Sequence, residues 1–117
     1  MRVLVALNPQ MYRQTIKFFL AERRPHLDVK SADPADLEQE LSGFRPDLLI
    51  CHEPIPAMRK RVLSQVEILY SDGLDALVRV QDRESRINNM GVQELLCAVD
   101  ETAKLVASEE RDQRPFF

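Results

Sequence analysis

The sequence is poor in the residues that mark several classes of protein. It has three glycines and no glycine-rich loop of the kind that brings a backbone close to a phosphate group. It has two cysteines, too few for the disulfide framework of a small secreted domain. No signal peptide is visible, and no apolar run approaches the ~20 residues that span a bilayer. These shortages argue against a phosphate-binding loop, a disulfide scaffold and a membrane anchor.

What is present indicates one ordinary soluble domain. The 117 residues are 44% hydrophobic and 30% charged, enough to build a core without disulfides or metal. The net charge of −3 argues mildly against nucleic-acid binding, and we interpret the basic clusters Arg23-Arg24 and 59–61 as solvated helix faces. We expect Cys51 and Cys97 to be reduced core thiols of a cytoplasmic protein.

The fold prediction starts from residues 44–56, FRPDLLICHEPIP. Residues 47–51 form a short apolar run with an acidic start, Asp47, and no polar alternation, which is typical of a central parallel strand covered by helices on both faces. Residues 3–7 are a second such run. The turn after the central strand lies where open α/β sheets place their ligands, at the carboxyl ends of the strands.

Strands and helices are predicted to alternate along the chain, which favours right-handed βαβ units. We predict strands at 3–7, 27–30, 47–51, 66–70 and 76–81, with a further short edge strand at 85–88 left open. We predict helices from Pro9 to Arg24, from Asp33 to Phe44, over 56–65 and from Asn89 to Val106.

These elements predict a three-layer, doubly wound, mostly parallel five-stranded sheet. About eight residues separate the ends of the fourth and fifth strands, whereas a parallel crossover needs a dozen or more. The fifth strand is therefore expected to run antiparallel, and the fourth helix to be missing. We predict one domain over 1–107 and a charged, flexible tail over 108–117.

The chain resembles the receiver domains of bacterial response regulators. The resemblance depends on RVLVALNP at 2–9, PDLLICHEPIP at 46–56 and GVQELLCAVDETAKLV at 91–106. It implies a flavodoxin-like sheet with the order 2-1-3-4-5. Receiver domains accept a phosphoryl group on an aspartate after the third strand, with Mg²⁺ held by acidic residues after the first.

The matching positions in this chain differ from that pattern where the chemistry occurs. The acidic pair falls on Leu7 and Asn8, and the acceptor aspartate falls on His52. The hydroxyl residue matches Ser71, and the lysine falls near Arg79. Because Mg²⁺ needs oxygen ligands and Leu7 offers none, we expect a pseudo-receiver that is not phosphorylated, binds no metal or cofactor and is not an enzyme.

The candidate ligand residues lie at the carboxyl rim of the sheet: Asn8, His52, Glu53, Ser71 and Asp72. A metal or nucleophilic site built on Cys51 and His52 is disfavoured, because adjacent residues of a strand point to opposite faces. The first hypothesis is a non-catalytic interaction or regulatory domain in bacterial signalling. The alternative is a domain that senses a small ligand, such as an anion, at this rim.

The face without a helix suggests self-association. Leu77, Arg79 and Gln81 of the fifth strand are expected to face the side that the missing helix would cover. We therefore predict a symmetric homodimer through this face, with the protein partner, if any, unidentified.

Overall fold

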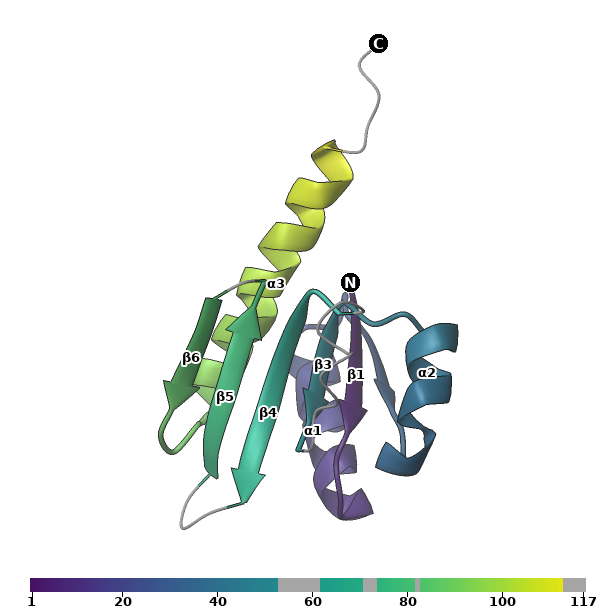
Figure 1. Cartoon of the computed structure of the whole chain (residues 1–117), viewed down its shortest axis with the longest axis vertical. Coiled ribbons are helices and arrows are strands. Elements are labelled where there is room, and N and C mark those ends of the chain that lie inside the picture. Colours follow the sequence, from purple (N-terminus) through teal and green to yellow (C-terminus); the bar gives the residue numbers. More distant parts are fainter. Residues whose placement is uncertain (53–61, 71–73, 82, 113–117) are drawn as a thin grey trace.

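The chain folds into one mixed sheet with helices on both faces (Figure 1). The computed structural model describes residues 1–52, 62–70, 74–81 and 83–112, and for 70, 74 and 108–112 it describes the backbone alone. In chain order the described elements are β1 (Arg2–Ala6), α1 (Gln10–Arg23), β2 (Asp28–Ser31), the 3₁₀ turn Pro34–Asp36, α2 (Leu37–Gly43), β3 (Leu48–Cys51), β4 (Ser64–Tyr70), β5 (Leu74–Val80), β6 (Arg83–Ile87) and α3 (Val92–Asp112).

The sheet has the order β2-β1-β3-β4-β5-β6. The first four strands are parallel, while β5 and β6 are antiparallel to their neighbours. The expected order of five strands and the antiparallel direction of the fifth are therefore found. The expectation of five strands is wrong, because Arg83–Ile87 pairs with β5 as a sixth strand.

No helix separates β4 from β5. The two strands pair along their whole length, from Ser64 opposite Val80 to Tyr70 opposite Leu74. Only residues 71–73 connect them, so the fourth helix of the receiver pattern has no place here. The short distance in sequence between the fourth and fifth predicted strands had indicated this hairpin.

Two apolar clusters cover the two faces of the sheet. Alternate residues of β1 face opposite sides: Val3 and Val5 pack beneath α1 and α3, and Leu4 and Ala6 pack against α2. All four side chains are buried. The unalternating apolar run therefore does mark a strand covered on both faces, as predicted.

The last helix packs on the second half of the sheet. Ala76, Val78 and Val80 of β5 share a core with Leu95 and Val99 of α3, as expected from the two periodicities. The helix continues to Asp112, past residue 107 where the domain was expected to end. The flexibility of the remaining tail stays a prediction.

The predicted helix over 56–65 extended too far. β4 begins at Ser64, and both Ser64 and Gln65 are buried strand residues. The start of this strand was hard to predict from the sequence, because Ser64 and Gln65 are polar and buried strands are normally apolar. The part of this prediction over 56–61 lies outside the described residues. No helix in the described part of the chain is both long and apolar enough to cross a membrane.

Candidate functional site

The rim after β1 is occupied by a local hydrogen-bond network. Leu7 is fully buried, and Asn8 is exposed directly after it. Arg13 Nη1 donates to Leu7 O (3.1 Å) and to Asn8 Oδ1 (3.2 Å). The predicted ligand residue Asn8 therefore holds the first turn of α1 against the end of β1.

The rim after β3 carries a buried thiol. The register places Cys51 beside Ala6, so His52 follows next to Leu7. Burial raises the pKa of the Cys51 thiol to about 12, and the charge of Glu67 adds to this, opposed by the hydrogen bond that Gln65 Nε2 donates to Sγ (3.8 Å). A thiol with such a pKa is protonated at neutral pH and is a poor nucleophile.

The other predicted rim residues do not build a described site. Register brings His52 and Asn8 to the ends of adjacent strands, whereas Glu53, Ser71 and Asp72 lie outside the described residues. Among the residues that the structure describes, no group of three or more His, Cys, Asp or Glu side chains could hold a metal ion. The expectation that both thiols lie in the core is wrong for Cys97, which is exposed on α3.

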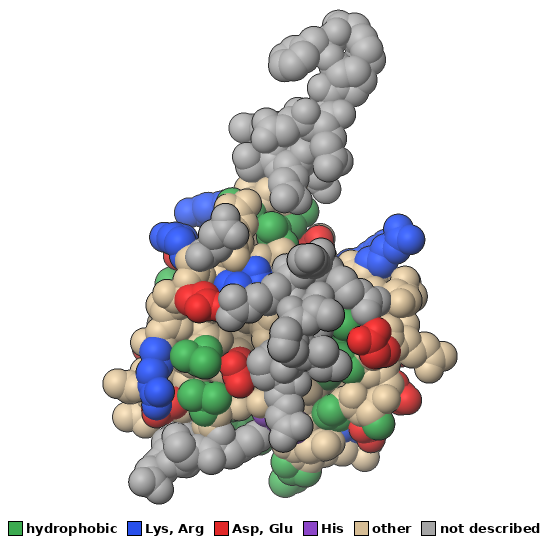
Figure 2. Space-filling model, in the orientation of Figure 1, with side chains coloured by type: hydrophobic (Ala, Val, Ile, Leu, Met, Phe, Trp, Pro, Cys, Tyr) green, Lys and Arg blue, Asp and Glu red, His purple; other side chains and the backbone are tan. Residues whose placement is uncertain are grey.

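The predicted dimer face is partly used within the chain. Leu77 is 40% exposed, as expected for a residue on the face away from α3. The Arg79 guanidinium donates to three backbone carbonyls, at Val62 (3.1 Å), Leu63 (3.4 Å) and Gln81 (2.8 Å). Arg79 thus ties the start of β4 to the end of β5. In Figure 2 the apolar side chains over β5 form a small patch bordered by acidic and basic groups.

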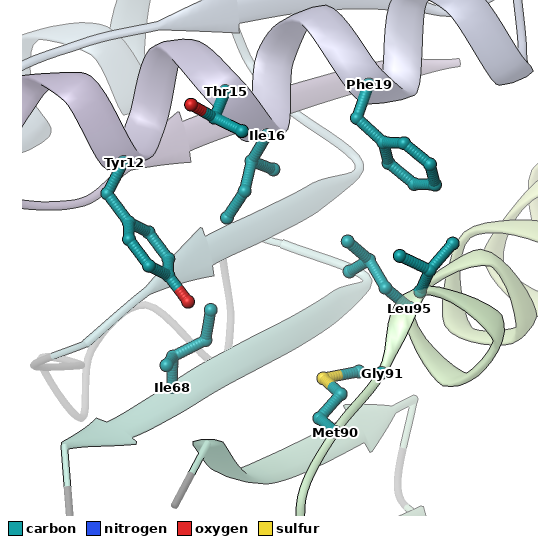
Figure 3. Close-up of a pocket in the computed structure, with 9 residues that line it drawn as sticks. Tyr12, Thr15, Ile16, Phe19, Ile68, Met90, Gly91 and Leu95 are labelled. Carbon is teal, nitrogen blue, oxygen red and sulfur yellow. The ribbon is translucent and has the colours of Figure 1, made fainter.

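An apolar groove lies between α1 and the start of α3, and it was not predicted from the sequence. Its volume is about 240 Å³, and its floor is Ile68 of β4. Figure 3 shows side chains of α1 directed across the gap toward Ile68 and Leu95. We call it the α1–α3 groove; its lining residues are Tyr12, Thr15, Ile16, Phe19, Ile68, Met90, Gly91, Val92 and Leu95.

The groove follows from how the two helices are placed. Both begin at the carboxyl end of the sheet, and they are joined farther along by Arg24, whose Nε and Nη2 each donate to an Asp100 carboxylate oxygen at 2.9 Å. At the start of α3, the Glu94 carboxylate accepts a hydrogen bond from Gly91 N (3.1 Å), which caps the helix. The helices are thus fixed at one end and leave apolar side chains uncovered between them at the other.

Exposed apolar side chains continue the groove onto the outer surface. Met11 is 77% exposed, Phe18 is 71% exposed and Val92 is 49% exposed. On α1, Met11 lies one turn before Thr15 and Phe18 one turn after it, both on the side of Thr15 that faces away from Ile16. Of the four large hydrophobic side chains that are exposed in the described part of the chain, only Leu77 lies elsewhere.

Comparison of the chain with protein-family models, with curated proteins and with solved structures gave no match. The receiver resemblance therefore remains a hypothesis.

The described lining of the α1–α3 groove is suited to binding apolar groups. It is apolar except for the hydroxyl groups of Tyr12 and Thr15. Among the described residues that line the groove, none supplies a carboxylate, an imidazole or an amine, the usual groups for general acid or base work. The chemistry of the lining favours an apolar surface as the occupant.

Proposed function

We propose that this chain is a non-catalytic, receiver-like interaction domain with a regulatory role in bacterial signalling. Its α1–α3 groove receives an apolar helix of a partner protein. The domain is not phosphorylated and acts in the cytoplasm. By binding its partner it changes which of the partner's surfaces are accessible to other molecules.

The exposure of Phe18 and Met11 beside the groove is the observation that carries this proposal. Large apolar side chains that gather around a cleft on a protein surface mark a place where another molecule binds. A small ligand inside the groove would leave Phe18 and Met11 in water. A helix lying along the groove would cover them together with Val92, so a helical occupant accounts for the whole surface.

A helix is the favoured shape because the groove itself runs between two helices. An amphipathic helix enters such a groove with apolar residues at intervals of three and four, one turn after another. The lining residues Tyr12, Ile16 and Phe19 follow the same spacing on α1. The ridges of a third helix can pack between those of α1 and α3.

The groups at the rim support the non-catalytic part of the proposal. At the position of the receiver's acidic pair, Leu7 is buried and Asn8 binds Arg13. Beside them, the Cys51 thiol is held in its protonated form by burial. These described groups offer Mg²⁺ neither of the carboxylates that hold it in a receiver domain.

Selection of helical peptides from a displayed random library tests the proposal. We expect the selected peptides to share apolar residues at positions i, i+3 or i+4, and i+7. Phe18→Glu should weaken their binding at least about tenfold, because it puts a charge where the partner's apolar face must lie. The matched control is Ala21→Glu, which adds the same charge at an exposed position of α1 that does not line the groove.

Two results would refute the proposed site. One is a selected set without helical spacing. The other is equal loss of binding in Phe18→Glu and Ala21→Glu, which would mean that charge on α1, rather than the groove, controls binding.

A further inference from the structure

We propose that β6 forms the interface of a two-fold dimer, in which it pairs antiparallel with β6 of a second copy about Ser85. β6 is the outermost strand of the sheet, and four of its five residues are exposed. An outer strand presents unpaired backbone groups along one side, and another strand can pair with them. The result is a sheet that continues from one copy into the other.

The hydrogen-bond pattern shows which residues of β6 face the open edge. Gln81 N donates to Leu63 O at the start of β4, so Val80, the residue before it, directs its backbone groups toward β6. Val80 is paired with Arg83. Because the pattern alternates, Arg83, Ser85 and Ile87 bond to β5. The N–H and C=O groups of Glu84 and Arg86 therefore point to the open edge.

Charge selects the register of this pairing. Two-fold antiparallel pairing about Ser85 places Glu84 of each copy opposite Arg86 of the other, and these two pairs also exchange the backbone hydrogen bonds. Pairing about Glu84 would set two glutamates opposite each other, and pairing about Arg86 would set two arginines opposite each other. Like charges directly opposite each other destabilise a sheet, whereas opposite charges stabilise it.

The side chains of the two charged residues are placed for this contact. They share the face of the sheet that carries Leu77, because Arg86 is paired with Leu77 and Glu84 with Arg79. The Arg86 side chain is 58% exposed; its Nη2 contacts Asp75 (3.1 Å) and its Nε donates to Asn88 Oδ1 (3.4 Å). In the described part of the chain, Nη1 is left for a carboxylate from the second copy.

The helices leave room for the dimer. α3 packs over β5, one strand away from the edge. In the dimer the two β5 strands are three strand spacings apart, about 14 Å at roughly 4.8 Å per spacing. Packed helices need about 8–10 Å between their axes, so the two copies of α3 do not collide. They flank the new strand pair on one face.

This interface is the strand edge rather than the face around Leu77. Charged residues on an outer strand usually prevent pairing. Here the sequence Glu-Ser-Arg at 84–86 is complementary to itself when read in opposite directions, so the same charges favour one partner, a second copy of this chain. Four backbone hydrogen bonds and two ion pairs make a small interface, which predicts dissociation at low concentration.

Sedimentation velocity from about 5 to 200 µM tests the inference, with Glu84→Arg and Arg86→Glu as variants. The wild-type chain should change from monomer to dimer with concentration, and each variant should raise the dissociation constant about tenfold or more. An equimolar mixture of the two variants should restore the dimer, because every 84–86 pair then joins opposite charges. Leu77→Ala is the control: it removes apolar surface from the open face without adding a charge beside Arg86, and it should dimerise as the wild type does.

Each other outcome overturns the inference. A wild-type monomer over the whole range shows that the edge does not pair. Loss of the dimer in Leu77→Ala but not in Glu84→Arg assigns the interface to the open face. Circular dichroism checks that both charge variants are folded, since Arg86→Glu also removes the contact with Asp75. If Arg86→Glu unfolds, Glu84→Arg alone still decides, because it adds a like charge opposite Arg86 and leaves the Asp75 contact intact.

Discussion

Truncating Leu49 to alanine tests the central strand most severely. Leu49 is fully buried in β3 and belongs to the core between the sheet and α2. Leu41 and Leu37 of α2 belong to the same core, with Leu4 from β1. The side chain therefore joins α2 to the middle of the sheet, and its loss leaves a cavity that these neighbours can fill only in part.

The size of the effect follows from the atoms removed. Leu49→Ala removes three buried carbon atoms, and at about 0.8 kcal/mol each the transfer term is roughly 2.4 kcal/mol. The cavity raises the expected loss to about 3–4 kcal/mol, within the usual range for buried leucines. The same substitution at Leu77, which is 40% exposed on the same face of the sheet, should cost less than about 1.5 kcal/mol.

Urea unfolding of wild type, Leu49→Ala and Leu77→Ala measures both values under the same conditions. We expect the midpoint of Leu49→Ala to fall strongly with little change in the slope, because the folded state stays compact. A loss below about 1 kcal/mol for Leu49→Ala, or equal losses for the two variants, would contradict the assignment of β3 as the central strand.

Three further predictions concern chemistry at named residues. Incubation with acetyl phosphate and Mg²⁺ should leave the intact mass unchanged, because His52 stands where a receiver has its aspartate; a gain of one phosphoryl group that survives mild acid but not hydroxylamine would contradict this. Iodoacetamide should label the exposed Cys97 and spare Cys51, whose pKa is raised to about 12 by burial, until the protein is unfolded; two labels on the folded chain would show that the β3 core is open. The hydrogen bond from Arg24 lowers the pKa of Asp100 in the folded state. The Arg24–Asp100 pair therefore stabilises the fold fully above the pKa that Asp100 has in the unfolded chain, about 3.9, and this stabilisation is lost as the pH falls through the lower pKa of the folded state. Between about pH 5 and 2.5 the wild type should therefore lose more stability than Asp100→Asn. Equal losses in the two proteins would show that the Arg24–Asp100 pair does not stabilise the fold.

The two central parallel strands, β1 and β3, could be predicted because they are almost wholly apolar. Residues 3–7 and 48–51 lack polar residues, and the structure buries both runs on two faces. Such a run has few alternatives to a central strand in a covered sheet. The hairpin of β4 and β5 was predictable as well, because the distance between the two runs left no room for a helix.

The polar strand residues could not be predicted in the same way. Ser64 and Gln65 open β4, and both are buried although they are polar, in a strand that lies between β3 and β5. β6 has only one partly buried residue, Ile87, and owes its extended form to pairing with β5. Pairing between strands leaves no mark on hydrophobic periodicity when the side chains face water.

The α1–α3 groove is formed by segments that are far apart in the sequence: α1, β4 and the start of α3. The spacing of Tyr12, Ile16 and Phe19 indicated a buried stripe, but it did not indicate that part of this stripe would remain uncovered beside Met90. One signal was present in the sequence. Met11 and Phe18 are large apolar residues off the core stripe of α1, and such residues at helical spacing suggest a second contact surface.

The most direct test of the proposed function is the location of a bound peptide on the ¹⁵N-labelled chain. Amide shifts would be followed by NMR during titration with a peptide selected for binding. We expect the largest shifts in Gln10–Phe19 of α1 and in residues 90–96, with small changes at Asn8 and His52. Shifts centred on Asn8 and His52, or on β6, with α1 unaffected would contradict the proposed function.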